Sequence, residues 1–241
     1  MKAETTGLPD LPLPTRSLFT GYILVVGVGL LMSGVQILLT HGLADGDVGI
    51  SVDDIVYSYY GNRSNSKLET KLNGSMQDKA PVDVKRAIIM WAQQGASREE
   101  WDDRIGAHFE QYCVKCHSVI PAIPSFKTYE GVSPAAAVDT GETVDTLARV
   151  SHIHLFGIAF IFVFVGYIFN QAVGFSPALK SALIITPFAF LLVDVLSWWL
   201  TKWYPNFAIL TLIGGFGYAV ASVIMLFTSL YQMWIVPLTH R

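Results

Sequence analysis

The stretch "SHIHLFGIAFIFVFVGYIFN", residues 151–170, decides the class of fold to which this chain belongs. After its two histidines it is almost entirely apolar, and about 20 such residues in a helix cross the hydrocarbon core of a membrane. Three further stretches have the same character, at residues 17–40, 181–200 and 206–235. The chain is 52% hydrophobic and 15% charged, whereas soluble domains are about 25% charged. The sequence therefore predicts a membrane protein with four spanning helices.

The first of these stretches begins directly after Arg16. Its apolar run is longer than the roughly 7–15 residues at the centre of a cleavable signal peptide, so we interpret it as an uncleaved anchor. Lysine and arginine are enriched on the cytoplasmic side of membrane proteins. Four spans with both ends inside place Lys202 in the outer loop. The residues then on the cytoplasmic side are Lys2, Arg16, Lys180 and Arg241.

A polar segment, residues 42–149, separates the first and second spans. It holds 16 of the 19 acidic residues and 11 of the 16 basic ones, a balance of −5. Nucleic-acid binding needs a basic face, so this composition argues against a nucleic-acid partner. We predict an all-α fold with a small helical domain inserted between the first and second of four transmembrane helices. The predicted parts are residues 1–41 as cytoplasmic tail and anchor, 42–149 as the inserted domain, and 150–241 as a three-helix membrane domain.

Four helices are predicted in the inserted domain, at residues 53–59, 67–72, 82–94 and 98–116. The last of them follows Ser97, which together with Glu100 has the pattern of an N-terminal capping box. Apolar residues then recur at helical spacing and are expected to bury one face. These residues are Trp101, Ile105, Phe109 and Tyr112. The proline-rich residues 117–131 are expected to be extended.

The fourth of these helices leads into "CVKCH", residues 113–117, which contains both cysteines of the chain. C-x-x-C-H is the attachment pattern of c-type haem. One turn of helix presents two thiols to the two vinyl groups of a porphyrin, and the next residue then lies under the iron as an axial imidazole. A thioredoxin-like redox pair needs a surrounding βαβ pattern, and a structural zinc site needs further cysteine or histidine ligands. The sequence shows neither context, and a chance match is the remaining alternative.

With this motif at the end of a helix that carries aromatic packing residues, the inserted domain resembles a c-type cytochrome. The resemblance covers residues 42–149 only. It implies one covalent haem c on Cys113 and Cys116, with His117 as an axial ligand of the iron. It also implies attachment outside the cytoplasm, so we expect the domain to lie in the periplasm of a bacterium and the spans to lie in the inner membrane.

The orientation of His117 is the next expectation. A haem histidine is oriented by the group that its second ring nitrogen meets. The residues after the motif include Pro121 and Pro124, and either carbonyl oxygen is expected to accept the ring N–H of His117.

The sixth ligand of the iron departs from the common single-haem pattern. In that pattern a methionine follows the motif by several dozen residues, yet residues 118–149 contain no methionine and no histidine. The preceding stretch, residues 72–95, resembles the missing ligand loop and closing helix, so Met76 is one candidate ligand. Met90 lies inside the predicted helix and is expected to be a core residue.

Two further candidates, His152 and His154, lie where the chain enters the second span. They are roughly 200° apart around a helix, so they cannot both face one site, and we favour His154. Asp194 lies within the third span, where an unpaired carboxylate is costly. A histidine of the second span is its expected partner, since a ligating imidazole commonly donates its other N–H to a carboxylate. A protonated Asp194 bonded to Ser197 or to the backbone is the alternative.

These features predict a membrane-bound c-type cytochrome that transfers single electrons in a respiratory chain as a subunit of a larger complex. The expected partners are the membrane, other electron-transfer proteins or complex subunits, and quinol. One alternative is a quinol-oxidising enzyme, in which a histidine and Asp194 take the protons and haem c takes the electrons. Another is a haem-based redox or gas sensor with an open sixth position.

Overall fold

The computed structural model describes residues 7–42, 49–120 and 123–239, and these residues are organised almost entirely as helices. Within the described residues no strand forms, and Ser66 and Val138 make an isolated antiparallel bridge. The all-α prediction is therefore confirmed. The chain divides into two compact units. We call Met1–Gly42 with Thr143–Arg241 the membrane unit, and Leu43–Glu142 the inserted unit.

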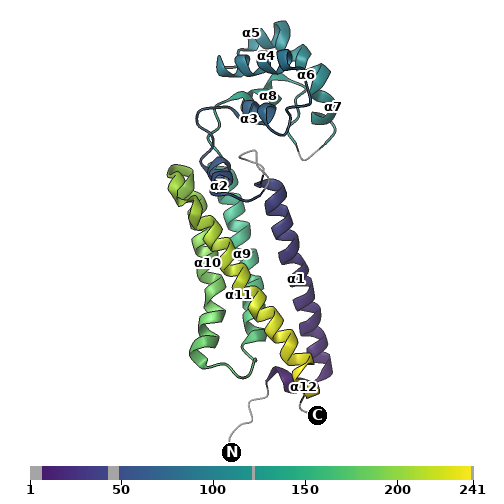
Figure 1. The fold of residues 1–241 in the computed structure, drawn as a ribbon, viewed down its shortest axis with the longest axis vertical. Coiled ribbons are helices and arrows are strands. Elements are labelled where there is room, and N and C mark those ends of the chain that lie inside the picture. Colours follow the sequence, from purple (N-terminus) through teal and green to yellow (C-terminus); the bar gives the residue numbers. More distant parts are fainter. Residues whose placement is uncertain (1–6, 43–48, 121–122, 240–241) are drawn as a thin grey trace, which may run out of the picture. The chain divides into compact units, whose positions relative to one another are not determined.

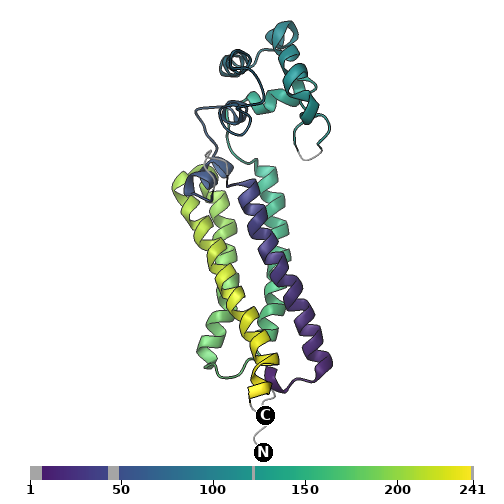
Figure 2. The ribbon, with the colours of Figure 1, turned by 45° about the vertical axis from the view of Figure 1, so that its right-hand side comes forward.

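The membrane unit is a bundle of four long helices, each long and apolar enough to cross a membrane. They are α1 (Leu13–Thr40), α9 (Val144–Phe169), α10 (Pro177–Trp203) and α11 (Ala208–Trp234). Figure 1 shows them lying side by side, and Figure 2 shows the same bundle after a turn of 45°. The prediction of four membrane-spanning helices is thus supported. A short helix, α12 (Val236–Thr239), follows α11.

Helix α9 begins earlier than the second span was expected to begin. The Thr143 hydroxyl accepts a hydrogen bond from Thr146 N at 3.1 Å and so caps its first turn. A side-chain acceptor at this position satisfies one of the free N–H groups of a helix start. His152 and His154 consequently lie in the third turn of α9 rather than in its first.

The closest contact in the bundle joins α10 to α11 through two glycines. A Cβ at Gly214 would lie 2.7 Å from Cα and Cβ of Asp194, and a Cβ at Gly217 would lie 2.5 Å from the Phe190 ring. Small residues let two membrane helices approach at the level of their backbones. The two glycines of α11 therefore allow its backbone to pack directly against α10 at Asp194.

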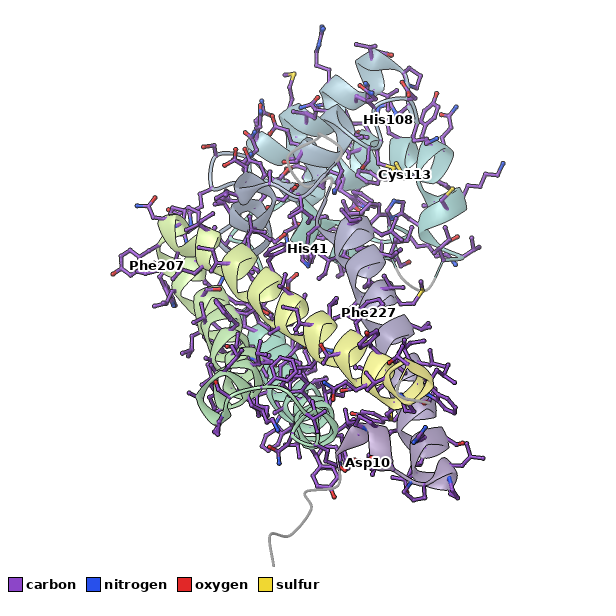
Figure 3. The ribbon with its side chains drawn as sticks, turned by 60° about the horizontal axis from the view of Figure 1, so that its bottom comes forward. Asp10, His41, His108, Cys113, Phe207 and Phe227 are labelled. Carbon is purple, nitrogen blue, oxygen red and sulfur yellow. The ribbon has the colours of Figure 1, made fainter. Side chains whose placement is uncertain are left out.

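Helix α1 is attached to the bundle mainly near its first turns. Arg16 Nε donates to Leu11 O at 2.7 Å, and Nη1 donates to Met233 O at 2.9 Å near the end of α11. The Tyr22 hydroxyl donates to Ile161 O on α9 at 3.1 Å. Figure 3 labels Asp10, just before α1, and Phe207, just before α11, at opposite ends of the unit. The start of α1 and the end of α11 therefore lie at one end, as an even number of spans requires.

The inserted unit is built from short helices around one apolar core. Its elements are α2 (Val52–Tyr59), α3 (Lys67–Asn73), α4 (Val82–Gln93), α5 (Arg98–Glu100), a π-helical turn (Trp101–Ile105), α6 (Gly106–Tyr112), α7 (Val114–His117) and α8 (Tyr129–Ala136). The core centres on Ile88, Trp91, Ile105 and Phe109, all fully buried. The predicted helices at 53–59, 67–72 and 82–94 are confirmed to within one residue at each end.

Helix α8 was not predicted, and its first residues fall in the stretch expected to be extended. The Thr128 hydroxyl accepts from Gly131 N and caps the helix start. Val132 and Ala136, one turn apart, are buried in the core. Burial of this apolar face favours the helix over the extended chain that the prolines suggested.

The α10–α11 contact generates a stability prediction. In the Gly214→Ala variant the new methyl group meets the Asp194 backbone, so we expect a loss of about 1–3 kcal/mol in the free energy of unfolding. The matched control is Gly215→Ala, because the nearest atom to that Cβ is the Tyr218 hydroxyl at 3.9 Å. Thermal unfolding in detergent, followed by circular dichroism, should show a lower Tm for Gly214→Ala alone. Equal Tm values for the two variants would contradict the packing described here.

Candidate functional site

The helix that leads to the cysteine motif is anchored by aromatic packing. The Ser97 hydroxyl accepts from Glu100 N at 3.2 Å and caps α5, which confirms the N-cap of the predicted capping box, whereas the Glu100 carboxylate accepts from Arg104 Nη2 at 3.0 Å. The Trp101 and Phe109 rings lie 5.1 Å apart between centroids, and Trp91 packs against Trp101 at 5.8 Å. Tyr112 packs on the same core. The predicted apolar face is confirmed, and it fixes the direction in which the chain reaches Cys113.

The predicted continuous helix over 98–116 is wrong in two places. A π-helical turn occupies Trp101–Ile105, in which Gly106 N donates to Trp101 O five residues earlier. A Cβ at Gly106 would lie 3.0 Å from Trp101 O and 3.3 Å from the indole, so the absence of a side chain allows this turn to form. The second interruption is at Cys113, which lies between α6 and α7.

The cysteine motif itself forms one helical turn, as its spacing predicted. Cys113 O accepts hydrogen bonds from Cys116 N at 3.2 Å and from His117 N at 3.0 Å. Both cysteines are free thiols. Figure 3 labels Cys113 where α6 ends and α7 begins. The two thiols are therefore one turn apart on a fixed backbone, and the imidazole follows directly.

The two thiols differ in environment. Cys113 is partly buried and packs against the core of the inserted unit, whereas Cys116 is exposed. Burial raises the pKa of the Cys113 thiol to about 11, because the apolar surroundings penalise the thiolate. At neutral pH the Cys113 side chain is therefore a protonated thiol in the folded, haem-free chain.

His117 is held by a hydrogen bond and a ring contact. Its Nδ1 lies 2.9 Å from the carbonyl oxygen of Pro124, which can only accept, so Nδ1 carries the proton and donates. Its ring stacks on Phe126 at 4.1 Å between centroids with the planes 5° apart. The predicted bond to Pro124 is confirmed, whereas Pro121 lies outside the described residues. The proton on Nδ1 leaves the Nε2 lone pair available for a metal.

An open cleft of about 530 Å³ lies beside the motif. This volume falls within the range of about 300–1,000 Å³ that is typical of ligand pockets. Its lining includes Trp101, Gly106, Val114 and Phe126, together with the charged residues Asp102, Glu110 and Lys127. Val114 belongs to the motif and Phe126 packs on His117, whereas the two cysteines and His117 do not line the cleft.

These features fit the attachment of one haem c. The donor set comprises two thiols one turn apart and an imidazole whose Nδ1 bonds to Pro124 O, as the c-type pattern needs. Among the described residues, no three His, Cys, Asp or Glu side chains come together as a metal site. Haem iron differs from such sites because it takes at most two axial protein ligands.

Met76 and Met90 both lie in the inserted unit. Met76 follows α3, where its N–H donates to Lys71 O at 2.8 Å, and its side chain is exposed. Met90 was expected in the core, but 49% of its surface is exposed. The prediction for Met90 is wrong because Ile88 and Trp91 take the buried face of α4.

The two histidines of α9 point in different directions, as their spacing predicted. His152 is exposed and packs against Phe156 at 5.1 Å between ring centroids. His154 is half-buried, and its ring meets the Trp198 ring edge-on at 5.0 Å. His154 Nδ1 lies 2.9 Å from Val150 O, one turn earlier. The backbone carbonyl thus fixes the His154 tautomer and leaves Nε2 available.

Asp194 is buried in the bundle, with only 4% of its surface exposed. Its Oδ1 accepts a hydrogen bond from Trp198 Nε1 at 3.0 Å, and Ser197 Oγ donates to the Asp194 backbone carbonyl at 2.6 Å. The expected hydrogen bond from a histidine to the Asp194 carboxylate is therefore not formed among the described residues. Trp198 supplies the N–H to the carboxylate, and Val150 accepts the N–H of His154.

Three contacting residues were missed in the sequence. Trp198 follows Asp194 by four positions, and this spacing places two side chains on one helix face, so the pair was recognisable. Phe126, which stacks on His117, and Val150, which accepts the His154 N–H, carry no comparable local signal. The Phe126 contact forms because the loop after the motif folds back onto His117. The Val150 contact depends on the rotamer of His154.

Comparison with known proteins matches residues 132–239 to a family described as a transmembrane helical domain. The match spans α9, α10 and α11 and begins within α8. Searches of curated proteins and of solved structures gave no significant match. The family match therefore supports membrane association and carries no statement about chemistry.

The environment of Cys113 predicts slow alkylation in the haem-free, folded chain. With its pKa raised to about 11, the thiolate fraction of Cys113 at pH 8 is roughly 100-fold below that of a thiol with the ordinary pKa. In the Cys116→Ser variant, the iodoacetamide reaction of Cys113 should therefore be slow and should accelerate as the pH rises toward that value.

The matched variant is Cys113→Ser, which leaves the exposed Cys116 as the reacting thiol. Mass spectrometry of both variants over time gives the two rates, and denaturant should bring them together. Equal rates in the folded chains would contradict the burial of Cys113.

Proposed function

We propose that this protein is a membrane-anchored c-type cytochrome that passes single electrons. One haem c is bound through Cys113 and Cys116, with His117 as an axial ligand. The observation that carries the proposal is the single turn of "CVKCH" together with the hydrogen bond from His117 Nδ1 to Pro124 O at 2.9 Å. When bound, haem c supplies a one-electron carrier whose iron alternates between the ferric and ferrous states.

Each group of this chain has a defined part in the proposal. Cys113 and Cys116 hold the cofactor covalently, so it stays attached during turnover. Pro124 keeps the proton on Nδ1 of His117 and directs Nε2 to the iron. Phe126 packs flat against the imidazole and limits its rotation. The four spans of the membrane unit retain the carrier at the membrane.

The burial of Cys113 bears on the order in which haem attachment and folding occur. Thioether formation needs access to the thiol, and in the folded, haem-free chain this thiol packs against the core. Attachment therefore precedes or accompanies the folding of the inserted unit. Because haem c is attached outside the cytoplasm, the proposal places the inserted unit in a bacterial periplasm and the spans in the inner membrane. The partners are other electron-transfer proteins or subunits of a respiratory complex.

Loss of one thiol tests the attachment. We expect Cys116→Ser, expressed with a periplasmic haem-attachment system, to lose most or all covalent haem. Val114→Ala is the matched control, because it changes the motif without removing a thiol or the imidazole, and it should load haem normally. Haem staining of a denaturing gel measures the covalent fraction. Equal staining of the two variants, or no staining of the unchanged protein, would overturn the proposal.

The sixth ligand is a separate prediction. His154 is our proposed sixth ligand, with His152 and Met76 as the alternatives. The His154→Ala variant should convert the ferric iron to a high-spin form that binds CO when reduced. His152→Ala is the matched control from the same helix and should leave the optical spectrum unchanged, as should Met76→Ala. A high-spin spectrum in Met76→Ala alone would assign the ligand to Met76, which raises the reduction potential relative to bis-imidazole ligation.

A further inference from the structure

Asp194 is an ionisable group within a membrane span. It lies nine residues before Trp203, the last residue of α10, which is roughly 13–14 Å along the helix. Its side chain is buried between helices. Ionisable residues in such positions are costly and are retained mostly where they serve a function.

The hydrogen bonds of Asp194 leave much of its capacity unused. An ionised carboxylate has about four acceptor positions. Among the described residues the donor that reaches it is Trp198 Nε1, at 3.0 Å. No salt bridge to Asp194 forms within residues 7–42, 49–120 and 123–239. The site therefore suits a ligand that brings a further hydrogen-bond donor.

The surroundings of Asp194 form a polar face on α10. Asp194, Ser197, Trp198 and Thr201 follow the spacing i, i+3, i+4 and i+7 that places residues on one side of a helix, and all four are buried. Ser197 Oγ pairs with Thr211 Oγ1 of α11 at 2.6 Å. Thr201 Oγ1 is buried and has no hydrogen-bond partner among the described residues. This free hydroxyl is a second polar group in need of a partner on the same face.

Two aromatic side chains flank this face from the neighbouring helices. His154 of α9 meets the Trp198 ring. Tyr218 of α11 follows Gly214, which packs against Asp194, by four positions and so lies on the same side of that helix. Both side chains are half-buried. At Gly214 the α11 backbone itself lies against Asp194, and no side chain from that position covers the carboxylate.

A ligand for this face must be soluble in lipid and must carry a hydroxyl group. We propose that Asp194 is the hydrogen-bond acceptor of a binding site for a quinol, a dihydroxy aromatic dissolved in the membrane. The choice of a quinol among lipid-soluble hydroxyl compounds rests on the proposed function, because quinols exchange electrons with haem proteins. Trp198 is a positioning residue, since its indole N–H holds the carboxylate.

The redox form of the ligand gives the sharpest test. A quinol has hydroxyl donors for the carboxylate, whereas the corresponding quinone has only acceptors. Hydrogen bonds to charged groups are the strong ones, so at a pH at which Asp194 is ionised the purified protein should bind decylubiquinol about 10- to 100-fold more tightly than decylubiquinone. Isothermal titration calorimetry in detergent micelles measures both dissociation constants. In Asp194→Asn this preference should disappear, because the amide also offers an N–H donor to the quinone.

Two further variants complete the design. Ser229→Ala is the matched control, because Ser229 is a buried hydroxyl far along α11 that bonds to Met225 O, and it should keep the full preference. Trp198→Phe removes the donor that positions the carboxylate and should reduce the preference several-fold. If Asp194→Asn does not fold, Trp198→Phe decides the question.

Different results would overturn the quinol site and the cytochrome assignment. Equal binding of both redox forms to the unchanged protein, no saturable binding of either, or a full preference in the Asp194 or Trp198 variant would overturn the quinol site. A sterol or other lipid alcohol that competes equally with decylubiquinol would overturn the choice of ligand class. Haem staining of the same samples reports the attachment independently, so a haem-free protein that still prefers quinol would overturn only the cytochrome assignment.

Discussion

The hydrogen bond from His117 to the Pro124 carbonyl fixes the chemistry of the inserted unit. It forces the proton onto Nδ1 and leaves Nε2 with a lone pair that can bind a metal. This imidazole lies at the end of a turn that carries two thiols. The bond also brings the chain back across the imidazole, so that Phe126 can stack on it and join the apolar core. Loss of this contact would free both the ring orientation and the loop that closes the core.

The membrane unit obeys a different constraint. A helix satisfies its own backbone in lipid, but buried side-chain polar groups need partners that the solvent cannot supply. Most of the buried polar groups of α10 and α11 find them locally, as Ser197 does with Thr211. Asp194 is only partly satisfied, and Thr201 is not satisfied at all within the described chain. Ser222 Oγ on α11 is likewise buried without a partner among the described residues, so unsatisfied polar groups occur on both α10 and α11.

The sequence predicted the features that depend on periodicity and on short motifs. The four spans, the aromatic face around Phe109 and the turn at Cys113 all follow from spacing within one helix. The features that depend on a contact between distant residues were harder to predict. Gly106 allows a π-helical turn under Trp101, helix α8 forms because Val132 and Ala136 reach the core, and Asp194 bonds to Trp198 rather than to His154. In each case the local sequence favours no single conformation strongly, and tertiary packing determines which one forms.

We propose that both thiols of "CVKCH" carry one haem. Tandem mass spectrometry of the proteolytic peptides from the protein purified out of membranes tests it most directly. We expect the peptides containing Cys113 and Cys116 to be joined to a single haem through two thioether bonds. Peptides in which both cysteines are free thiols, isolated from cells that attach haem to a known c-type cytochrome, would contradict it.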